Sequence, residues 1–244
     1  MRLALTLHNM NALKLALGIA RPIGKAKAIQ GGAAKTGSSS AVKLPPELKQ
    51  KIFERDNHTC QCCGFEAQKY QEIHHINSNK NDDRESNLTT LCIFCHQCFN
   101  LDNVNNMRSG VLIWLPEITQ ARLNHIARAI YVARISQGPM ADAARKTLDI
   151  LMGRREEVKN RLGTDDPFIL SSVLQDYLGD KHYHFRDKKL SGVKLFPLDR
   201  RIIKEADLEF NQFPQILAYW RSKNGPFGGK TPPQWVSIYK AIGA

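Results

Sequence analysis

The chain has 244 residues, of which 42% are apolar and 24% are charged, the composition of an ordinary soluble globular protein. No apolar run approaches the roughly 18 residues that a membrane-spanning helix needs, so we expect no transmembrane segment. The composition also excludes a collagen-like or wholly disordered chain, and the length allows one large domain or a small domain with a second module.

The formal net charge of +12 is concentrated at the two ends of the chain. Residues 1–45 contain seven basic and no acidic residues, and residues 181–244 contain twelve basic and five acidic residues. Because a basic surface attracts phosphate groups, the ends suggest nucleic acid or an anionic surface as a partner. Residues 46–105, which hold all six cysteines, contain six basic and nine acidic residues, and this balance argues against a simple nuclease.

Residues 1–29 are predicted to form a short strand with alternating leucines, followed by a helix from about Asn11. Polar residues interrupt the apolar stretch near the start, which argues against a secretory signal. Residues 30–45 are small and polar over most of their length and bury too little surface to order themselves. We therefore interpret them as a flexible linker.

Residues 46–105 are predicted to form a zinc-binding core that begins with a helix after a pair of prolines. Two C-x-x-C pairs, separated by 28 residues, are typical of two tight turns that close one tetrahedral zinc site. The predicted ligands are Cys60, Cys63, Cys92 and Cys95. Disulfides, or cysteines buried as small apolar side chains, are the alternatives. The remaining Cys62 and Cys98 are expected to pack or to face outward, although Cys98 continues the second run and could replace a ligand.

A second constellation lies between and after the cysteine pairs and consists of His74, His75, Asn87 and His96. It resembles the HNH, or ββα-metal, nuclease motif, in which a hairpin and a helix hold one divalent ion. On that template the first strand carries the two adjacent histidines. The second strand begins near Leu88, and the helix starts near Ile93.

The HNH resemblance assigns a chemical role to each of these residues. Phosphodiester hydrolysis needs a base that activates water and a cation beside the scissile phosphate. His75 would be the base, since neutral imidazole titrates near neutral pH, and His74 and His96 would hold Mg²⁺, Mn²⁺, Ni²⁺ or Zn²⁺. Asn87 would orient His75 or tie the loop to the hairpin. Asn100, four residues after His96, occupies the place of a further ligand, for which an amide is weak.

Residues 106–244 are predicted to be mostly helical and to bind a partner. An apolar run from Val111 is typical of a buried strand, and the apolar positions after Ile118 follow helical spacing. Further helices are predicted at 140–162, 167–178 and 200–221. The predicted fold class is therefore α+β, with a zinc-stabilised HNH-like core followed by a mostly helical half.

The stretches at 55–71, 85–104 and 110–118 are similar to the IcmJ family, also called DotN, of type IVB secretion systems. The motifs FPQILAYW and PPQW near the C-terminus fit that family more loosely. The resemblance implies a zinc-bound HNH-like adaptor in a coupling complex, with the cytoplasmic tail of a DotL-type ATPase as its partner. It also implies a cytoplasmic location, at the inner face of the membrane through that partner.

Two hypotheses therefore stand. In the first, the chain is a non-catalytic adaptor whose helical half binds a protein segment. In the second, it is a metal-dependent HNH endonuclease that cleaves DNA. The acidic balance of residues 46–105, the long helical half and the family resemblance favour the adaptor, whereas the complete set of His74, His75, Asn87 and His96 favours the nuclease.

Overall fold

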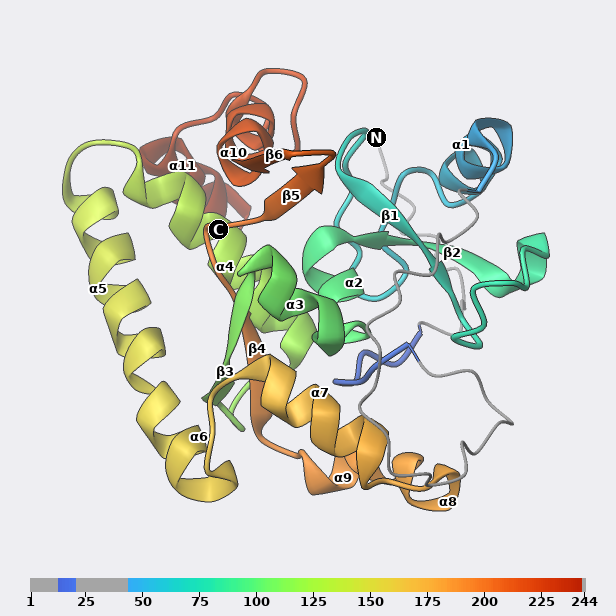
Figure 1. The fold of residues 1–244 in the computed structure, drawn as a ribbon. Coiled ribbons are helices and arrows are strands. Elements are labelled where there is room, and N and C mark those ends of the chain that lie inside the picture. Colours follow the sequence, from blue (N-terminus) through green and yellow to red (C-terminus); the bar gives the residue numbers. More distant parts are fainter. Residues whose placement is uncertain (1–12, 21–43, 243–244) are drawn as a thin grey trace.

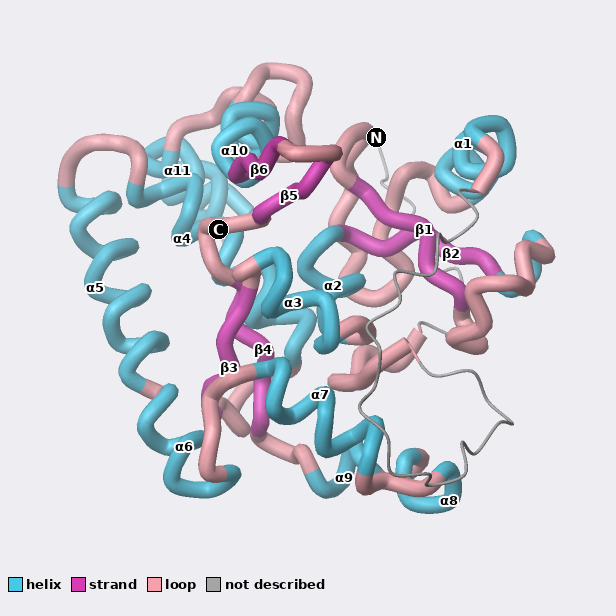
Figure 2. The backbone as a smooth tube through the Cα atoms, viewed as in Figure 1, coloured by secondary structure: helices cyan, strands magenta, loops and turns pink. Residues whose placement is uncertain are grey.

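The computed structural model describes residues 13–20 and 44–242, and it confirms the predicted α+β class (Figure 1). Three separate two-stranded antiparallel sheets, shown in magenta in Figure 2, lie among the helices. The sheets are β1–β2, β3–β4 and β5–β6. No helix in residues 13–20 and 44–242 is both long enough and apolar enough to cross a bilayer.

The first half of the described fold is a hairpin followed directly by a helix. β1 (Gln71–His75) pairs antiparallel with β2 (Leu88–Cys92), with His75 opposite Leu88, and η1 (Glu85–Asn87) precedes β2. α2 (Ile93–Cys98) then starts without an intervening loop. The predicted strand near His74, the strand start near Leu88 and the helix start near Ile93 are therefore confirmed.

The predicted helix after the proline pair is α1 (Pro46–Arg55), and it is fastened to β2 by polar contacts. The Asp56 carboxylate accepts a hydrogen bond from the Thr90 backbone N–H at 2.8 Å, and the Arg55 guanidinium donates to the Leu88 carbonyl at 2.8 Å. Asp56 is buried and also pairs with the Arg55 guanidinium at 2.8 Å, so its charge and the Thr90 backbone donor are both satisfied. These contacts hold β2 in place from the side opposite β1.

The second half is built mainly of helices. Its elements are α3 (Leu101–Met107), β3 (Gly110–Trp114), α4 (Gln120–Arg134), α5 (Pro139–Gly153), α6 (Arg155–Leu162), α7 (Pro167–Asp176), α8 (Asp180–Tyr183), α9 (Arg186–Lys189), β4 (Val193–Pro197), β5 (Ile202–Glu205), β6 (Leu208–Asn211), α10 (Phe213–Arg221) and α11 (Pro232–Ile242). β3 pairs antiparallel with β4, which the sequence did not predict. The two halves share one apolar core, in which Leu91 and Phe94 lie with Ile130, Phe196 and Trp220.

The expected helix from Asn11 is wrong for the residues that are described there, because 13–20 are neither helix nor strand. The Gly18 N–H donates to the Cys98 carbonyl at 2.8 Å, and the Gly18 carbonyl accepts from the Leu101 N–H at 3.0 Å. Leu17 and Ile19 are buried beside this contact. Backbone bonds to the turn between α2 and α3 therefore replace the intrahelical bonds that helical spacing predicted. The strand predicted before residue 13 and linker residues 30–43 lie outside the described residues.

The helix predicted over 200–221 is also wrong in its first part. Residues 202–211 form the β5–β6 hairpin, with Ile203 opposite Phe210, and only α10 is helical. Ala206 adopts a φ of 52°, the left-handed conformation that a tight turn requires. Cross-strand pairing across this turn satisfies the backbone groups that a helix would have bonded locally.

Candidate metal centre and histidine cavity

The four predicted cysteine ligands come together in the fold. Their sulfur atoms all lie within 4.8 Å of one another, and the Sγ atoms of Cys63 and Cys92 are 3.8 Å apart. A tetrahedral zinc ion with Zn–S bonds of about 2.3 Å would separate its sulfurs by about 3.8 Å. The cysteines form no disulfide. The cluster can therefore hold one metal ion such as zinc.

Each cysteine pair is presented by a tight backbone turn. In the first turn the Gly64 N–H donates to the Cys60 carbonyl at 2.8 Å, and Gly64 has a φ of 74°, which a residue without Cβ adopts freely. In the second, Cys92 ends β2 and caps α2, and its sulfur accepts from the Cys95 N–H at 3.4 Å. Sulfur acceptance from backbone N–H groups favours the thiolate that binds metal.

A buried arginine lies against the cysteine cluster. Arg128 on α4 is 1% exposed, and its Nη2 lies 2.6 Å from the Cys92 sulfur and 3.8 Å from the Cys63 sulfur. Its guanidinium stacks over Phe65 and Phe94, at 4.0 Å and 5.1 Å from the ring centroids. Burying this cation is costly unless an anion faces it. Four thiolates around one Zn²⁺ carry a net charge of −2, so the arginine fits a metal-loaded cluster.

Arg128 belongs to a polar stripe along the buried face of α4. The side chain of Gln120 donates to the Leu195 carbonyl and accepts from the Leu195 N–H, which anchors α4 to β4. Gln120 also donates to Asn124 at 3.0 Å, and Asn124 donates to the Cys95 sulfur at 3.3 Å. Sequence reasoning missed these residues. Their only signal is polar side chains at intervals of four on a helix face that is otherwise apolar.

Metal binding would resolve a conflict between burial and ionisation at the cluster. Burial raises the pKa of the Cys92 thiol well above its usual range. A bound cation favours the thiolate, so folding and metal binding are coupled.

Cys98 is buried, and its thiol donates to the Phe94 carbonyl at 3.2 Å, so it packs in the core. Cys62 is half-buried and packs against the other apolar cluster, the one that contains the four-cysteine site.

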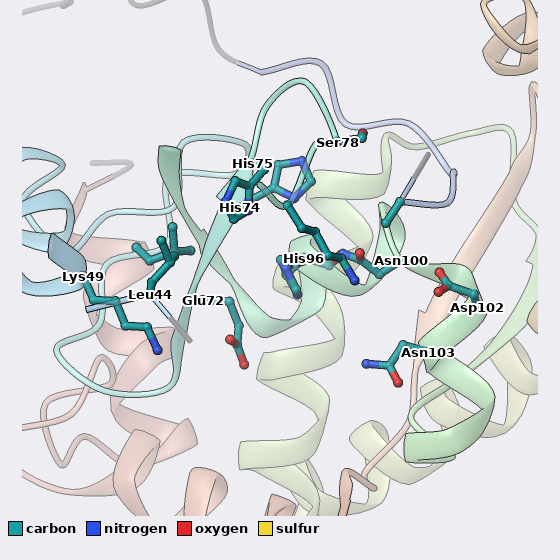
Figure 3. A pocket seen from close by; sticks show the side chains of 13 residues that line it. Leu44, Lys49, Glu72, His74, His75, Ser78, His96, Asn100, Asp102 and Asn103 are labelled. Atoms are coloured by element: carbon teal, nitrogen blue, oxygen red, sulfur yellow. Dashed lines mark hydrogen bonds between the residues drawn. The ribbon is translucent and has the colours of Figure 1, made fainter. Parts of the chain in front are cut away.

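The three predicted histidines line one cavity of about 410 Å³, together with Glu72 and Asn100 (Figure 3). The rings of His74 and His96 meet edge to face at 5.7 Å, and His74 stacks on Phe99 at 4.7 Å. Within the described part of the chain, the four cysteines are the one group of three or more His, Cys, Asp or Glu side chains close enough together to hold a metal ion. The pair of His74 and His96 stays a predicted site for a divalent ion.

The other predicted residues have distinct polar partners. The Nε2 atom of His75 lies 2.9 Å from an oxygen of Asp83. The Asn87 amide donates to Asn77 and to the Asp82 carbonyl, and its oxygen accepts from the Asn77 N–H. Of the two roles considered for Asn87, the structure therefore supports tying the loop to the hairpin.

Asn100, considered above as a further ligand, contacts His96. Its amide donates to the His96 carbonyl at 2.8 Å and lies 3.4 Å from the ring atom Nε2. The amide nitrogen of Asn100 is therefore held by His96, whereas a metal would bind the amide oxygen.

No model of a known protein family matches the chain. Over 175 residues, however, it is 34% identical to type 4 apparatus protein DotN of Legionella pneumophila, strain Philadelphia 1. The aligned region covers 69% of this chain and 81% of that protein. The chain belongs to the DotN family. The resemblance seen in the cysteine region is thus confirmed by identity over most of both chains.

In this DotN-family chain the predicted site residues fall into two groups with different surroundings. The cysteines lie in the core shared by both halves, whereas the histidines line a cavity beside the hairpin. Burial lowers the pKa of His74 to about 3 and that of His96 to about 3. Both rings are therefore neutral at physiological pH.

Replacing His74 with glutamine is expected to reduce the loss of stability in mild acid. In the unfolded chain the imidazole binds a proton below about pH 6.5, but the native ring resists protonation down to about pH 3, so unfolding is favoured between these values. Each such histidine contributes at most about 1.4 kcal/mol per pH unit. Urea unfolding from pH 6.5 to 4 measures the slope. Parallel slopes for wild type and His74→Gln would contradict the prediction, and exposed His182→Gln is the control.

Proposed function

We propose that the chain is a zinc-stabilised, non-catalytic adaptor of a type IVB secretion coupling complex. Its partner in this proposal is the cytoplasmic tail of a DotL-type ATPase, which holds the adaptor at the cytoplasmic face of the inner membrane. Membership of the DotN family supports the link to a type IV apparatus. The helical half, residues 106–244, would carry the partner-binding surface.

The closure of the cysteine cluster is the observation that carries the adaptor proposal. Cys60, Cys63, Cys92 and Cys95 supply four sulfur donors, and a zinc site with four protein ligands has no open position for a substrate or water. The cluster lies in the core that joins the two halves. Zinc held there would stabilise the scaffold, and the chemistry of the site is that of a structural ion.

Recovery of the ATPase with the tagged full chain tests this proposal. In a host that carries the secretion genes, we expect the chain to retain the coupling ATPase through purification at physiological salt. The double variant Cys60→Ala, Cys63→Ala should lose it, because the scaffold depends on metal. A chain that is recovered without the ATPase and remains bound to DNA at physiological salt would contradict the adaptor function.

A second candidate function is that of an HNH endonuclease. It is favoured by the strand, strand and helix that bring His74, His75 and His96 to one cavity, and by the contact between His75 and Asp83. In this hypothesis His75 accepts the proton of the attacking water, and Asp83 orients the ring. His74 and His96 would face the divalent ion that stabilises the leaving oxygen.

Plasmid cleavage separates the two functions. The adaptor proposal predicts no cleavage with Mg²⁺, Mn²⁺, Ni²⁺ or Zn²⁺. If wild type does cleave DNA, loss of the base in His75→Ala should lower the rate by about 10²–10⁴-fold at every metal concentration. His74→Ala and His96→Ala should instead regain part of their rate in excess metal. Equal cleavage by wild type and His75→Ala would mean that His75 is not the base.

A further inference from the structure

Helix α7 carries exposed apolar residues beside its buried face. Leu170 and Leu174 are buried in the core cluster that also holds residues of α3 and β3. Along the flank of this buried face, Ile169, Val173 and the C-cap residue Tyr177 form a row that we call the α7 stripe, and they are 49%, 42% and 81% exposed. Contiguous exposed apolar side chains often mark a surface that contacts another molecule. The α7 stripe is therefore a candidate contact surface for another molecule.

The C-terminal end of the α7 stripe leads into a basic segment. α8 and α9 follow α7 along the chain (Figure 1). Tyr183 and Leu190 pack against the same core cluster as the buried face of α7. Lys188 and Lys189 on α9 are exposed, and neither forms an ion pair with any described residue. The one acidic residue of α9, Asp187, is already paired with Lys14. An acidic partner would therefore find unpaired cations here.

The shape of the α7 stripe favours a helix as its cover. Its residues are spaced by four, so they form a single ridge along α7 about 12 Å long. Such a ridge fits between the ridges of a second helix. A bilayer contact, in contrast, needs apolar side chains spread over a plane. A second copy of this chain would bring the same lysines to the interface, where like charges repel. Residues 1–12 and 21–43 contain basic but no acidic residues, so they do not supply negative charge either.

We propose that the α7 stripe and the adjoining lysines form the docking surface for an acidic amphipathic helix of a partner protein. The apolar face of that helix covers Ile169, Val173 and Tyr177, and its acidic side chains face Lys188 and Lys189. This inference rests on the proposed function, since the partner helix is then a segment of the coupling ATPase tail. It adds the surface that receives the segment and the chemistry of the segment itself.

Val173→Glu in the full chain tests the docking surface by placing a negative charge within the α7 stripe. Ile150→Glu is the matched control, because Ile150 is an even more exposed apolar residue, at 68%, on the different helix α5. Relative to wild type, Val173→Glu should lower the recovery of the ATPase about tenfold or more. Lys188→Glu with Lys189→Glu should also lower it, whereas Ile150→Glu should match wild type. Unchanged zinc content and thermal midpoint establish that each variant is folded.

The outcomes distinguish this inference from the proposed function. If wild type itself fails to retain the ATPase, both the proposed adaptor function and the proposed docking surface are wrong. If wild type and Val173→Glu retain the ATPase equally, only the docking surface is overturned. Ile169→Ser with Tyr177→Ser repeats the test without a buried charge. Flotation with vesicles of phosphatidylglycerol that is lost in Val173→Glu would assign the stripe to a bilayer and also overturn the inference.

Discussion

Replacing Cys60 and Cys63 with alanine is expected to unfold the protein. Structural zinc contributes about 10–16 kcal/mol in zinc-finger peptides, which is comparable to the whole stability of a typical domain, about 5–15 kcal/mol. Here the cluster lies inside the core shared by both halves, so loss of the metal would remove the centre of that core. Metal analysis should find one zinc per wild-type chain, and circular dichroism should show no cooperative unfolding for the double variant.

Cys62→Ala is the matched control for this experiment, because Cys62 lies in the same turn but outside the four-cysteine cluster. It should keep both the zinc and the thermal midpoint of wild type. A strong chelator should reproduce the effect of the double variant in the wild-type protein. The prediction fails if wild type carries no stoichiometric zinc, or if the double variant unfolds cooperatively at the wild-type temperature.

Arg128→Met is expected to lower the free energy of unfolding by about 3–5 kcal/mol, the range measured when one partner of a buried ion pair is removed. Methionine retains much of the packing between Phe65 and Phe94 but leaves the charge of the cysteine cluster without its buried cation. Zinc transfer to a chelator should also become faster. Arg128→Lys should fall between wild type and Arg128→Met, because an ammonium lacks the planar stacking of a guanidinium.

The control for Arg128→Met is Arg122→Met, which removes an exposed arginine from the same helix. Its unfolding free energy should stay within about 0.5 kcal/mol of the wild-type value. Urea unfolding of both variants, with zinc bound, measures the difference. If Arg128→Met were as stable as wild type, the sulfurs next to it would have to be neutral thiols, and the charge argument for a metal-loaded cluster would be wrong.

The cavity beside the hairpin contrasts with the cysteine cluster. His74 packs against Phe99 and His96, and the Asn100 amide nitrogen contacts His96, so the histidine rings make aromatic and polar contacts with their neighbours. His75 still has an acidic partner in Asp83. The hydrolytic hypothesis therefore depends on the single question of whether these side chains can gather around a cation when DNA is present, which the cleavage assay answers.

Local sequence patterns predicted the helix after the proline pair, which follows from the prolines and from apolar spacing. The strand containing His74, the strand that starts at Leu88 and the helix at Ile93 were predicted from the resemblance to the HNH motif. Local patterns were wrong for residues 13–20 and 202–211. In both segments, apolar periodicity suggested a helix, but backbone hydrogen bonds to another segment or across a tight turn determined the conformation.

The sequence by itself determined the four cysteines of the cluster, because each C-x-x-C turn places two sulfurs together through local geometry alone. Only the tertiary structure decided what surrounds them. Arg128 and Asn124 reach the sulfurs because Gln120 anchors α4 to β4, whose Leu195 lies 75 residues further along the chain. Contacts between such distant segments depend on how apolar faces pack, and spacing within one segment carries no information about that packing.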